Sequence, residues 1–146
     1  MAAAKAETVA ARHPDRLVLA ADTVVAAGRR ILPKAETEAQ ARACLALLSG
    51  RRHRVISALH LIDPAGRARH RQSTTIVAFT RLTQADIAAC IGAGDWRGKA
   101  GGYALQGRAE AYVRFLSGSH SGVVGLPLFE TRALLAAAGY PCPARG

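Results

Sequence analysis

Two apolar segments joined by a short turn restrict the fold of this chain more than any other feature. Residues 53–63 (HRVISALHLID) and 71–82 (RQSTTIVAFTRL) are rich in valine, isoleucine, leucine and threonine, and Pro64 and Gly66 lie between them. β-Branched side chains favour strands, whereas proline and glycine favour tight turns. The pattern therefore predicts a β-hairpin.

Helical and strand patterns alternate along the rest of the chain. Helices are expected at residues 2–12, 36–48, 83–94 and at the end of 119–140. Further strands are expected at 16–26 and 110–118, with a turn at 28–33 and a glycine-dense loop at 95–107. Thr83 suits the cap of the third helix, because its hydroxyl can accept from the backbone of the first turn. The alternation predicts an α/β fold, a mixed sheet with flanking helices in a single domain over residues 1–146.

Length and composition exclude several classes of protein. The chain has 146 residues, of which 50% are hydrophobic and 21% charged, so wholesale disorder is not expected. No apolar run approaches the ~18 residues of a membrane span, and the first residues lack the apolar core of a secretory signal. Cys44, Cys90 and Cys142 form no CxxC pair, which argues against a disulfide framework or a structural zinc site. The expected compartment is the cytoplasm, with no membrane partner.

The charge of the chain favours a polyanionic partner. A formal net charge of +10 is compatible with a nucleic-acid binder or with an enzyme that acts on phosphate-bearing substrates. A nucleic-acid module would cluster its arginines and interleave aromatic side chains, but here the seventeen arginines are scattered and only seven residues are aromatic. Specific nucleic-acid binding is therefore not expected. Against so many arginines, the three lysines hint at a need for compact point charges.

Asp22 and Lys34 are the first two candidates for chemistry. Asp22 and Thr23 follow an apolar strand, and a carboxylate that leaves a buried strand is partly desolvated, so it can act as a base or a metal ligand. The alternative is an aspartate that caps a turn. Lys34 follows Pro33 and precedes the 36–48 helix, whose N-terminus can hold an anion. The alternative for this lysine is simple solvation.

The segment GKAGGYALQG, residues 98–107, is the third candidate. Its glycines let backbone N–H groups approach a ligand closely. Lys99 adds positive charge and Gln106 adds an amide that both donates and accepts, so both are candidates for binding a substrate. The spacing is neither that of a Walker A loop nor GxGxxG, and a plain surface turn is the alternative.

The histidines point to structure rather than to a metal site. His53 and His60 lie seven residues apart on one predicted strand, so their side chains face opposite sides of the sheet. We expect hydrogen-bonded structural roles for both.

Six short motifs together resemble the Maf family of nucleotide pyrophosphatases. In the family's order they are AAAKAE, ADTVV, ILPK, LSGRRHRV, KAGGYALQG and SGSHSGVVGLPLFET, and they run from Lys5 to Tyr140. Each motif is weak alone, but six in order at compatible spacing are specific. The resemblance implies a Maf/ITPase-like fold and hydrolysis of nucleoside triphosphates, with dTTP, UTP or modified nucleotides as substrates, to the monophosphate and pyrophosphate. It also implies a divalent metal cation, Mg²⁺ or Mn²⁺.

The same resemblance assigns roles to individual residues. Asp22 matches the family's proton acceptor, and it is also the candidate metal ligand. Lys5 and Lys34 match lysines that hold the phosphates. Thr23 and Gln106 match positions that set specificity, and this pair is similar to the branch that cleaves dTTP and UTP. Because family members are often dimers, a homodimer is expected.

One family feature is missing from the sequence. Family members begin with a strand and a phosphate-binding loop of the SxSPRR type, and these 146 residues contain no such segment. Pro33 and Ala35 also flank Lys34 where the family usually has glycine and proline. We therefore expect an N-terminally truncated domain that lacks the first strand and is less stable than a full-length member. The alternative function is a catalytically impaired remnant that binds nucleotide or a partner without turnover.

Overall fold

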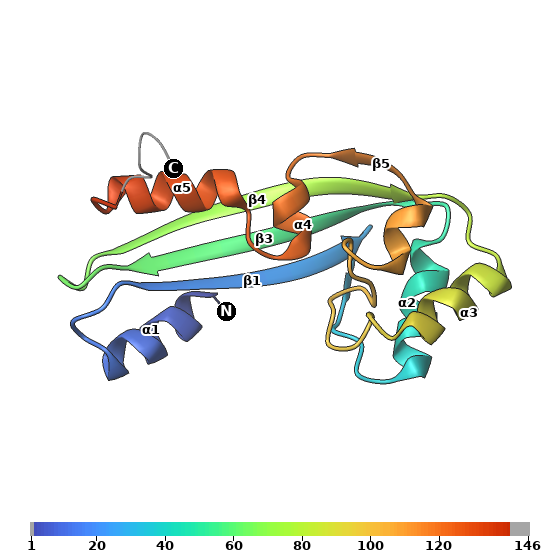
Figure 1. Cartoon of the computed structure of the whole chain (residues 1–146), viewed down its shortest axis with the longest axis horizontal. Coiled ribbons are helices and arrows are strands. Elements are labelled where there is room, and N and C mark those ends of the chain that lie inside the picture. Colours follow the sequence, from blue (N-terminus) through green and yellow to red (C-terminus); the bar gives the residue numbers. More distant parts are fainter. Residues whose placement is uncertain (1, 141–146) are drawn as a thin grey trace.

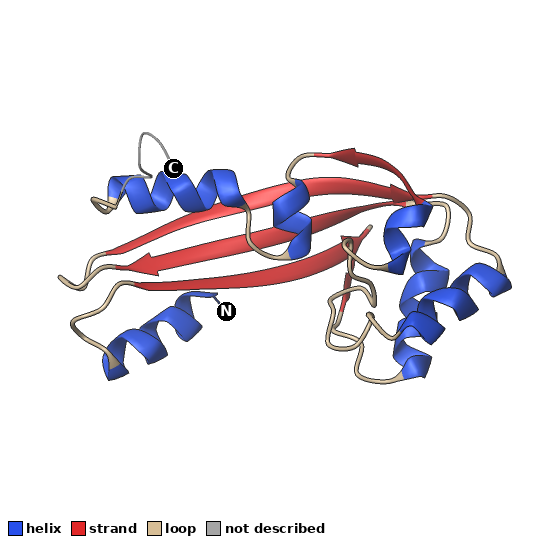
Figure 2. Cartoon of the chain, viewed as in Figure 1, coloured by secondary structure: helices blue, strands red, loops and turns tan. Residues whose placement is uncertain are grey.

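A long, twisted sheet of five strands forms the body of the molecule, and helices lie against it (Figure 1). The computed structural model describes residues 2–140. The strands are β1 (Val18–Ala27), β2 (Arg30–Leu32), β3 (Arg52–Ile62), β4 (Ala68–Phe79) and β5 (Val113–Ser117), in the spatial order β2-β1-β3-β4-β5. The helices are α1 (Ala2–Arg12), α2 (Glu38–Leu48), α3 (Gln84–Ala93), α4 (His120–Val124) and α5 (Leu128–Ala137), with a 3₁₀ helix η1 (Arg108–Tyr112) (Figure 2). Within residues 2–140, none of the helices has the length and apolar character needed to cross a membrane.

The predicted hairpin is confirmed, because β3 and β4 pair from one end of β3 to the other. Asp63 closes its turn by accepting from the backbone N–H groups of Gly66 and Arg67. The α/β class with flanking helices is confirmed as well. Every pairing among the described strands is antiparallel, in place of the mixed sheet that the alternation predicts. Tight turns join β1 to β2 and β3 to β4, and such turns produce antiparallel neighbours.

Three local predictions differ from the structure. The expected turn at 28–33 contains β2, which pairs with residues 25–27 of β1. The helix expected at the end of 119–140 is present as α5, but a short helix that was not expected, α4, precedes it. Gly125 ends α4 with a φ of 135°, and Pro127, which has no N–H to donate, precedes α5. The expected strand at 110–118 begins only at Val113, after η1.

Helices α1 and α5 cover opposite faces of one half of the sheet (Figure 1). Ala6 of α1 packs against Val18 and Ile62, whereas Leu134 of α5 packs against Leu61. Successive residues of a strand face opposite sides, so Leu61 and Ile62 separate the two layers.

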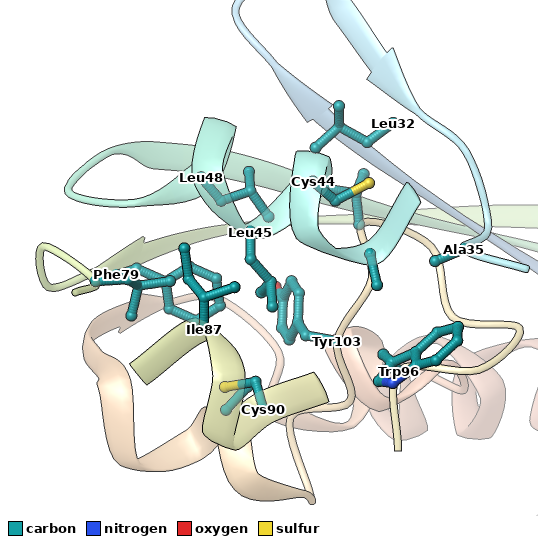
Figure 3. Close-up of a cluster of buried hydrophobic side chains, with 14 of the residues drawn as sticks. Leu32, Ala35, Cys44, Leu45, Leu48, Phe79, Ile87, Cys90, Trp96 and Tyr103 are labelled. Carbon is teal, nitrogen blue, oxygen red and sulfur yellow. The ribbon is translucent and has the colours of Figure 1, made fainter. Parts of the chain in front are cut away.

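The largest core fills the other half, between the sheet, α2, α3 and the 95–107 loop (Figure 3). Its fully buried large side chains include Leu45, Leu48, Phe79 and Trp96. Cys44 and Cys90 lie in this core as buried free thiols, and Cys142 lies outside the described residues. The core anchors the loop that carries two of the candidate residues.

Side-chain caps fix where α2 and α3 begin. Thr37 Oγ1 accepts from the Gln40 N–H at 3.2 Å, and Thr83 Oγ1 accepts from the Asp86 N–H at 3.1 Å. The predicted cap at Thr83 is thereby confirmed. Gly94 ends α3 with a left-handed φ of 76°, which glycine adopts without a side-chain clash.

Strand β1 has a free edge along most of its length. Its partner β3 lies on one side, but β2 pairs only with residues 25–27 on the other. Residues 18–24 therefore have no strand neighbour on that side within the part of the chain that the structure describes. Asp22 and Thr23 lie on this stretch, where other segments can approach them.

Candidate active site

One cavity of about 180 Å³ brings together all the candidate residues. Its lining includes Lys5, Asp22, Thr23, Lys34, Lys99 and Gln106. They come from α1, β1, the segment after β2 and the 95–107 loop, which are far apart in sequence. The three lysines are all the lysines of the chain, and all of them line the same cavity as Asp22.

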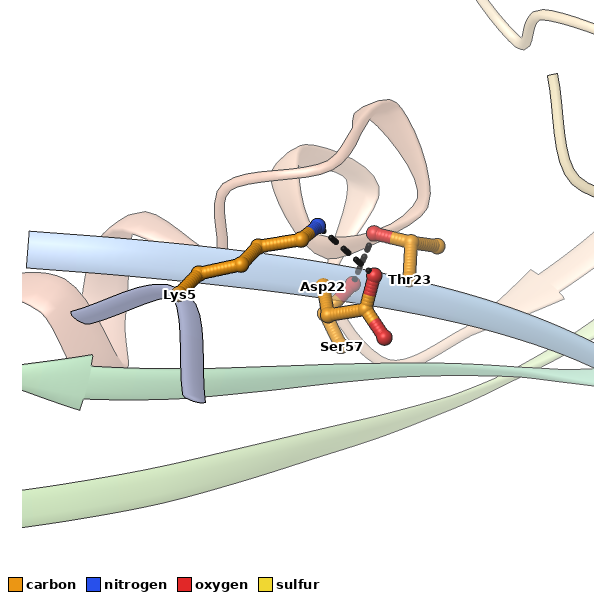
Figure 4. Close-up of polar contacts among 4 residues, drawn as sticks. All are labelled: Lys5, Asp22, Thr23 and Ser57. Carbon is orange, nitrogen blue, oxygen red and sulfur yellow. Dashed lines mark hydrogen bonds and ion pairs between the residues drawn. The ribbon is translucent and has the colours of Figure 1, made fainter. Parts of the chain in front are cut away.

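Asp22 is the buried anion of this cavity and points toward Lys5 (Figure 4). Only 9% of its side chain is exposed. Its Oδ1 lies 3.2 Å from Nζ of Lys5, whose side chain is half exposed. Helix α1 buries Ala2 and Ala6, which leaves Lys5 free to reach along β1. Oδ2 of Asp22 has no hydrogen-bond partner within residues 2–140, so one carboxylate oxygen stays available for water or a cation.

Backbone hydrogen bonds hold two lysines side by side. Lys34 forms a β-bridge with Ala100, and the Ala35 N–H donates to the Lys99 carbonyl at 3.0 Å. The Gly98 N–H in turn donates to the Ala35 carbonyl at 2.8 Å. The segment after β2 and the glycine-rich loop therefore run as a short antiparallel ladder, which fixes the origin of both cationic side chains.

Thr23 belongs to a buried polar chain that reaches α4. Its Oγ1 lies 3.1 Å from Oγ of Ser57 (Figure 4). Ser57 in turn donates to the Gly122 carbonyl at 2.6 Å. Ser57 is fully buried. These hydrogen bonds attach α4 to the sheet, where Val123 and Val124 form part of the cavity wall.

His53 has the structural role that the sequence predicts. Its Nε2 lies 2.6 Å from the Tyr103 hydroxyl, whereas His60 faces the other side and stacks on His70. Burial lowers the pKa of His53 to about 4 and raises the pKa of Tyr103 well above its ordinary value. Tyr103 lines the cavity, so the buried pair supports its wall from behind.

Sequence reasoning missed Ser57 and Tyr103 as parts of the site. The available signal for Ser57 is its phase, because it shares the inward face of β3 with His53 and Val55. The signal for Tyr103 is its place next to two glycines in the loop motif. Neither signal indicates which side chain the residue contacts in the folded protein.

We predict that acid destabilises the protein through His53. The unfolded imidazole titrates at its ordinary value of 6.5, and the folded one at about 4. Between these values the unfolded chain binds more protons, so the free energy of unfolding falls as the pH drops, by about 3 kcal/mol in total. Urea unfolding measured from pH 7 to pH 4 should show this decline.

The matched control is His53→Gln, whose amide can still bond to the Tyr103 hydroxyl but does not titrate. This variant should lose less stability than the wild type over the same interval. Parallel declines in the two proteins would contradict the assignment.

A divalent cation would have one protein carboxylate as its ligand here. Within residues 2–140, no group of three or more His, Cys, Asp or Glu side chains could hold an ion. Mg²⁺ commonly keeps several waters and binds through one or two carboxylates and the phosphates of a substrate. The available Oδ2 of Asp22, in a cavity lined by three lysines, fits this way of binding, in which the substrate brings most of the ligands.

Comparison with known proteins gives relatives over nearly the whole chain. Residues 1–138 match the family described as "Maf-like protein". A "dTTP/UTP pyrophosphatase" of Rhodospirillum rubrum is 62% identical over 140 residues, which are 96% of this chain and 67% of that protein. Proteins of the same name from Novosphingobium aromaticivorans and Paramagnetospirillum magneticum are 63% and 61% identical. The matches cover 95% and 96% of this chain and 69% and 74% of those proteins.

The family match and the cavity agree with the resemblance seen in the sequence. The motifs on which that resemblance depends supply the lysines, the carboxylate and the amide that line the cavity. With a match over residues 1–138 and relatives above 60% identity, this chain belongs to the Maf-like protein family.

Proposed function

We propose that this chain hydrolyses nucleoside triphosphates to the monophosphate and pyrophosphate, with dTTP and UTP as substrates. The observation that carries the proposal is the convergence of Asp22 and all three lysines on one cavity. Relatives above 60% identity named dTTP/UTP pyrophosphatase support the same reaction.

The phosphates would bind beside the lysines of the cavity. Lys5, Lys34 and Lys99 line it, and a triphosphate brings about four negative charges that these lysines can neutralise. Negative charge moves onto the leaving pyrophosphate during hydrolysis, and positioned cations stabilise that charge most. A bound Mg²⁺ or Mn²⁺ would add charge neutralisation at the phosphate oxygens.

Asp22 would serve as the proton acceptor. A water oxygen forms a bond to the α-phosphorus, the bond from that phosphorus to the bridging α,β-oxygen breaks, and the water proton passes to the carboxylate. Burial of Asp22 keeps competing water away, and the Lys5 ammonium at 3.2 Å holds the carboxylate in place. Orientation and proton transfer by one positioned carboxylate typically contribute about 10²–10⁴-fold to a rate.

The nucleobase would bind beside the neutral side chains of the cavity, Thr23 and Gln106. We propose the cytoplasm as the compartment, since Cys44 and Cys90 are buried free thiols. The homodimer stays a prediction of the family resemblance.

The test is an assay of products with UTP or dTTP and Mg²⁺ or Mn²⁺. We expect equal amounts of monophosphate and pyrophosphate, and no diphosphate or free phosphate, because attack falls on the α-phosphorus. A chelator should stop the reaction if the cation binds with the substrate. Nucleotide binding without any product would favour the alternative of a non-catalytic remnant, and steeply salt-dependent binding to DNA or RNA alone would favour a nucleic-acid binder.

A further inference from the structure

We propose that Ser57 makes Thr23 a hydrogen-bond acceptor, and that this acceptor selects bases whose pairing edge carries an N–H group. Uracil and thymine carry such a donor at N3, whereas cytosine carries a lone pair there. Ser57 is thus a positioning residue for specificity, although it is fully buried and does not line the cavity. The inference rests on the proposed function, since it concerns which triphosphate that cavity prefers.

The direction of the polar chain follows from counting protons. A carbonyl oxygen can only accept, so the 2.6 Å contact between Ser57 and the Gly122 carbonyl uses the single hydroxyl proton of Ser57. The 3.1 Å contact between the two hydroxyls then has only one arrangement, in which Thr23 donates to Ser57. The proton of Thr23 is therefore directed into the protein. What Oγ1 of Thr23 can still offer to a ligand is a lone pair.

The backbone around α4 makes this arrangement rigid. Ser119 caps α4 by accepting from the Gly122 N–H at 2.9 Å, and the Ser119 N–H donates to Thr75 Oγ1 at 2.9 Å. The Gly122 carbonyl is thereby fixed against β3. A Cβ atom at Gly125 would lie 3.8 Å from Thr23 Oγ1, so the end of α4 is in close range of the same hydroxyl.

The chemistry of the lining residues favours Thr23 and Gln106 as the groups that contact a base. Lys5, Lys34 and Lys99 suit the triphosphate, and Asp22 suits the attacking water. The polar side chains that remain neutral are Thr23, Gln106 and Tyr103, and the Tyr103 hydroxyl is engaged with His53. A base needs neutral hydrogen-bonding groups and an apolar wall, and Val123 and Val124 supply the wall.

Thr23 and Gln106 then differ in what they can discriminate. The amide of Gln106 can turn to present either its oxygen or its nitrogen, so by itself it fits several base edges. The acceptor of Thr23 cannot turn, because its proton is held by Ser57. It gains a hydrogen bond from the N3–H of uracil or thymine, but faces the N3 lone pair of cytosine without a proton between them. Leaving a buried polar group without a hydrogen-bond partner costs more binding free energy than one hydrogen bond contributes.

The experiment compares kcat/KM for UTP and CTP in the wild type and in Ser57→Ala. We expect the wild type to prefer UTP by at least about tenfold, which is the scale of one hydrogen bond gained and one lost. In Ser57→Ala the Thr23 hydroxyl is released and can donate to the N3 of cytosine. The preference should therefore fall by about tenfold, mainly through better use of CTP. A Ser57→Ala preference equal to that of the wild type would overturn the inference.

The matched control is Ser73→Ala. Ser73 lies directly opposite Ser57 on β4, is also buried, and has a hydroxyl of the same size, but no hydrogen bond joins it to Thr23. The UTP preference should survive in this variant. An equal loss in both variants would mean that packing, not proton direction, sets the preference, and would also overturn the inference.

Thr23→Val keeps the shape of the side chain and covers the case in which Ser57→Ala does not fold. It removes the acceptor, so the UTP preference should fall to the level expected for Ser57→Ala, and an unchanged preference would count against the inference.

Binding of the non-hydrolysable α,β-methylene analogues of UTP and CTP separates this inference from the proposed function. A Ser57-dependent binding preference without turnover would keep the inference and refute the proposed function. Turnover without a Ser57-dependent preference would keep the proposed function and refute the inference.

Discussion

Asp22→Asn should reduce pyrophosphate release from UTP or dTTP by about 10³-fold, within the range for loss of a positioned general base. The amide has the same shape as the carboxylate, so the cavity should keep its form, but it cannot take the water proton. The ion pair with Lys5 is also lost, and with that lysine half exposed the cost in folding stability should be at most about 1 kcal/mol. Steady-state kinetics and urea unfolding of the variant measure the two effects separately.

Asp63→Asn is the matched control. Asp63 also pairs with a cation, Arg69 at 3.1 Å, but it lies in the β3–β4 turn and does not line the cavity. This variant should keep the activity of the wild type while losing a comparable ion pair. The assignment of Asp22 fails if both variants lose activity equally, or if Asp22→Asn keeps most of its turnover while still folded.

The parts of the fold that the sequence predicted well are those in which local signals agree. The β3–β4 hairpin has apolar strands on both sides of a proline and glycine turn, and both observations require only neighbouring residues. The same holds for α3, where Thr83 provides the cap and Gly94 the left-handed end. Strand β2 shows the opposite case, since three residues carry too little pattern to be distinguished from a turn and gain their structure by pairing with β1.

Helix α4 was missed, because only one helix was expected, at the end of residues 119–140. Gly125 and Pro127 lie two residues apart, and each disfavours a continuous helix. The five residues of α4 are too few to show a helical pattern in the sequence. The end of α4 at Gly125 matters for the site. The Gly122 carbonyl of α4 accepts from Ser57 of β3, and a Cβ atom at Gly125 would lie 3.8 Å from Thr23 Oγ1.

The candidate residues of the site could be found from sequence because their types are unusual in their surroundings. Lys34 and Lys99 are lysines in a chain of arginines, and Asp22 is an acid in an apolar strand. Their meeting in one cavity was expected only through the family resemblance. Contacts such as Ser57 with Gly122 join residues 65 positions apart, and no local pattern encodes which serine meets which carbonyl.

The close packing of Gly101 against β1 leads to the second large effect, on stability. Gly101 has a φ of 72°, and a Cβ atom there would lie 2.9 Å from Cγ1 of the buried Val25. Gly101→Ala should cost about 2–4 kcal/mol, because a left-handed alanine costs about 1 kcal/mol and forced overpacking about 1–3. Gly98→Ala is the control, since Gly98 has a φ of 67° in the same loop but nothing within 4 Å of its Cβ position. Gly98→Ala should lower the free energy of unfolding, measured with urea, only by the cost of the left-handed alanine, about 1 kcal/mol.

The origin of the excess cost can be tested in a double-mutant cycle with Val25→Ala. Shortening Val25 removes the two Cγ atoms at 2.9 and 3.1 Å but leaves its Cβ at 3.1 Å, so Gly101→Ala should cost less in that background than in the wild type. Activity should follow the same order, because a shift of the loop moves Lys99 relative to Asp22, and misplacement of about 1 Å can cost about 10²-fold in rate. If Gly101→Ala costs no more than Gly98→Ala in the wild-type background, the loop is not held by its contact with β1. The packing of Val25 would then not be what positions Lys99 in the cavity.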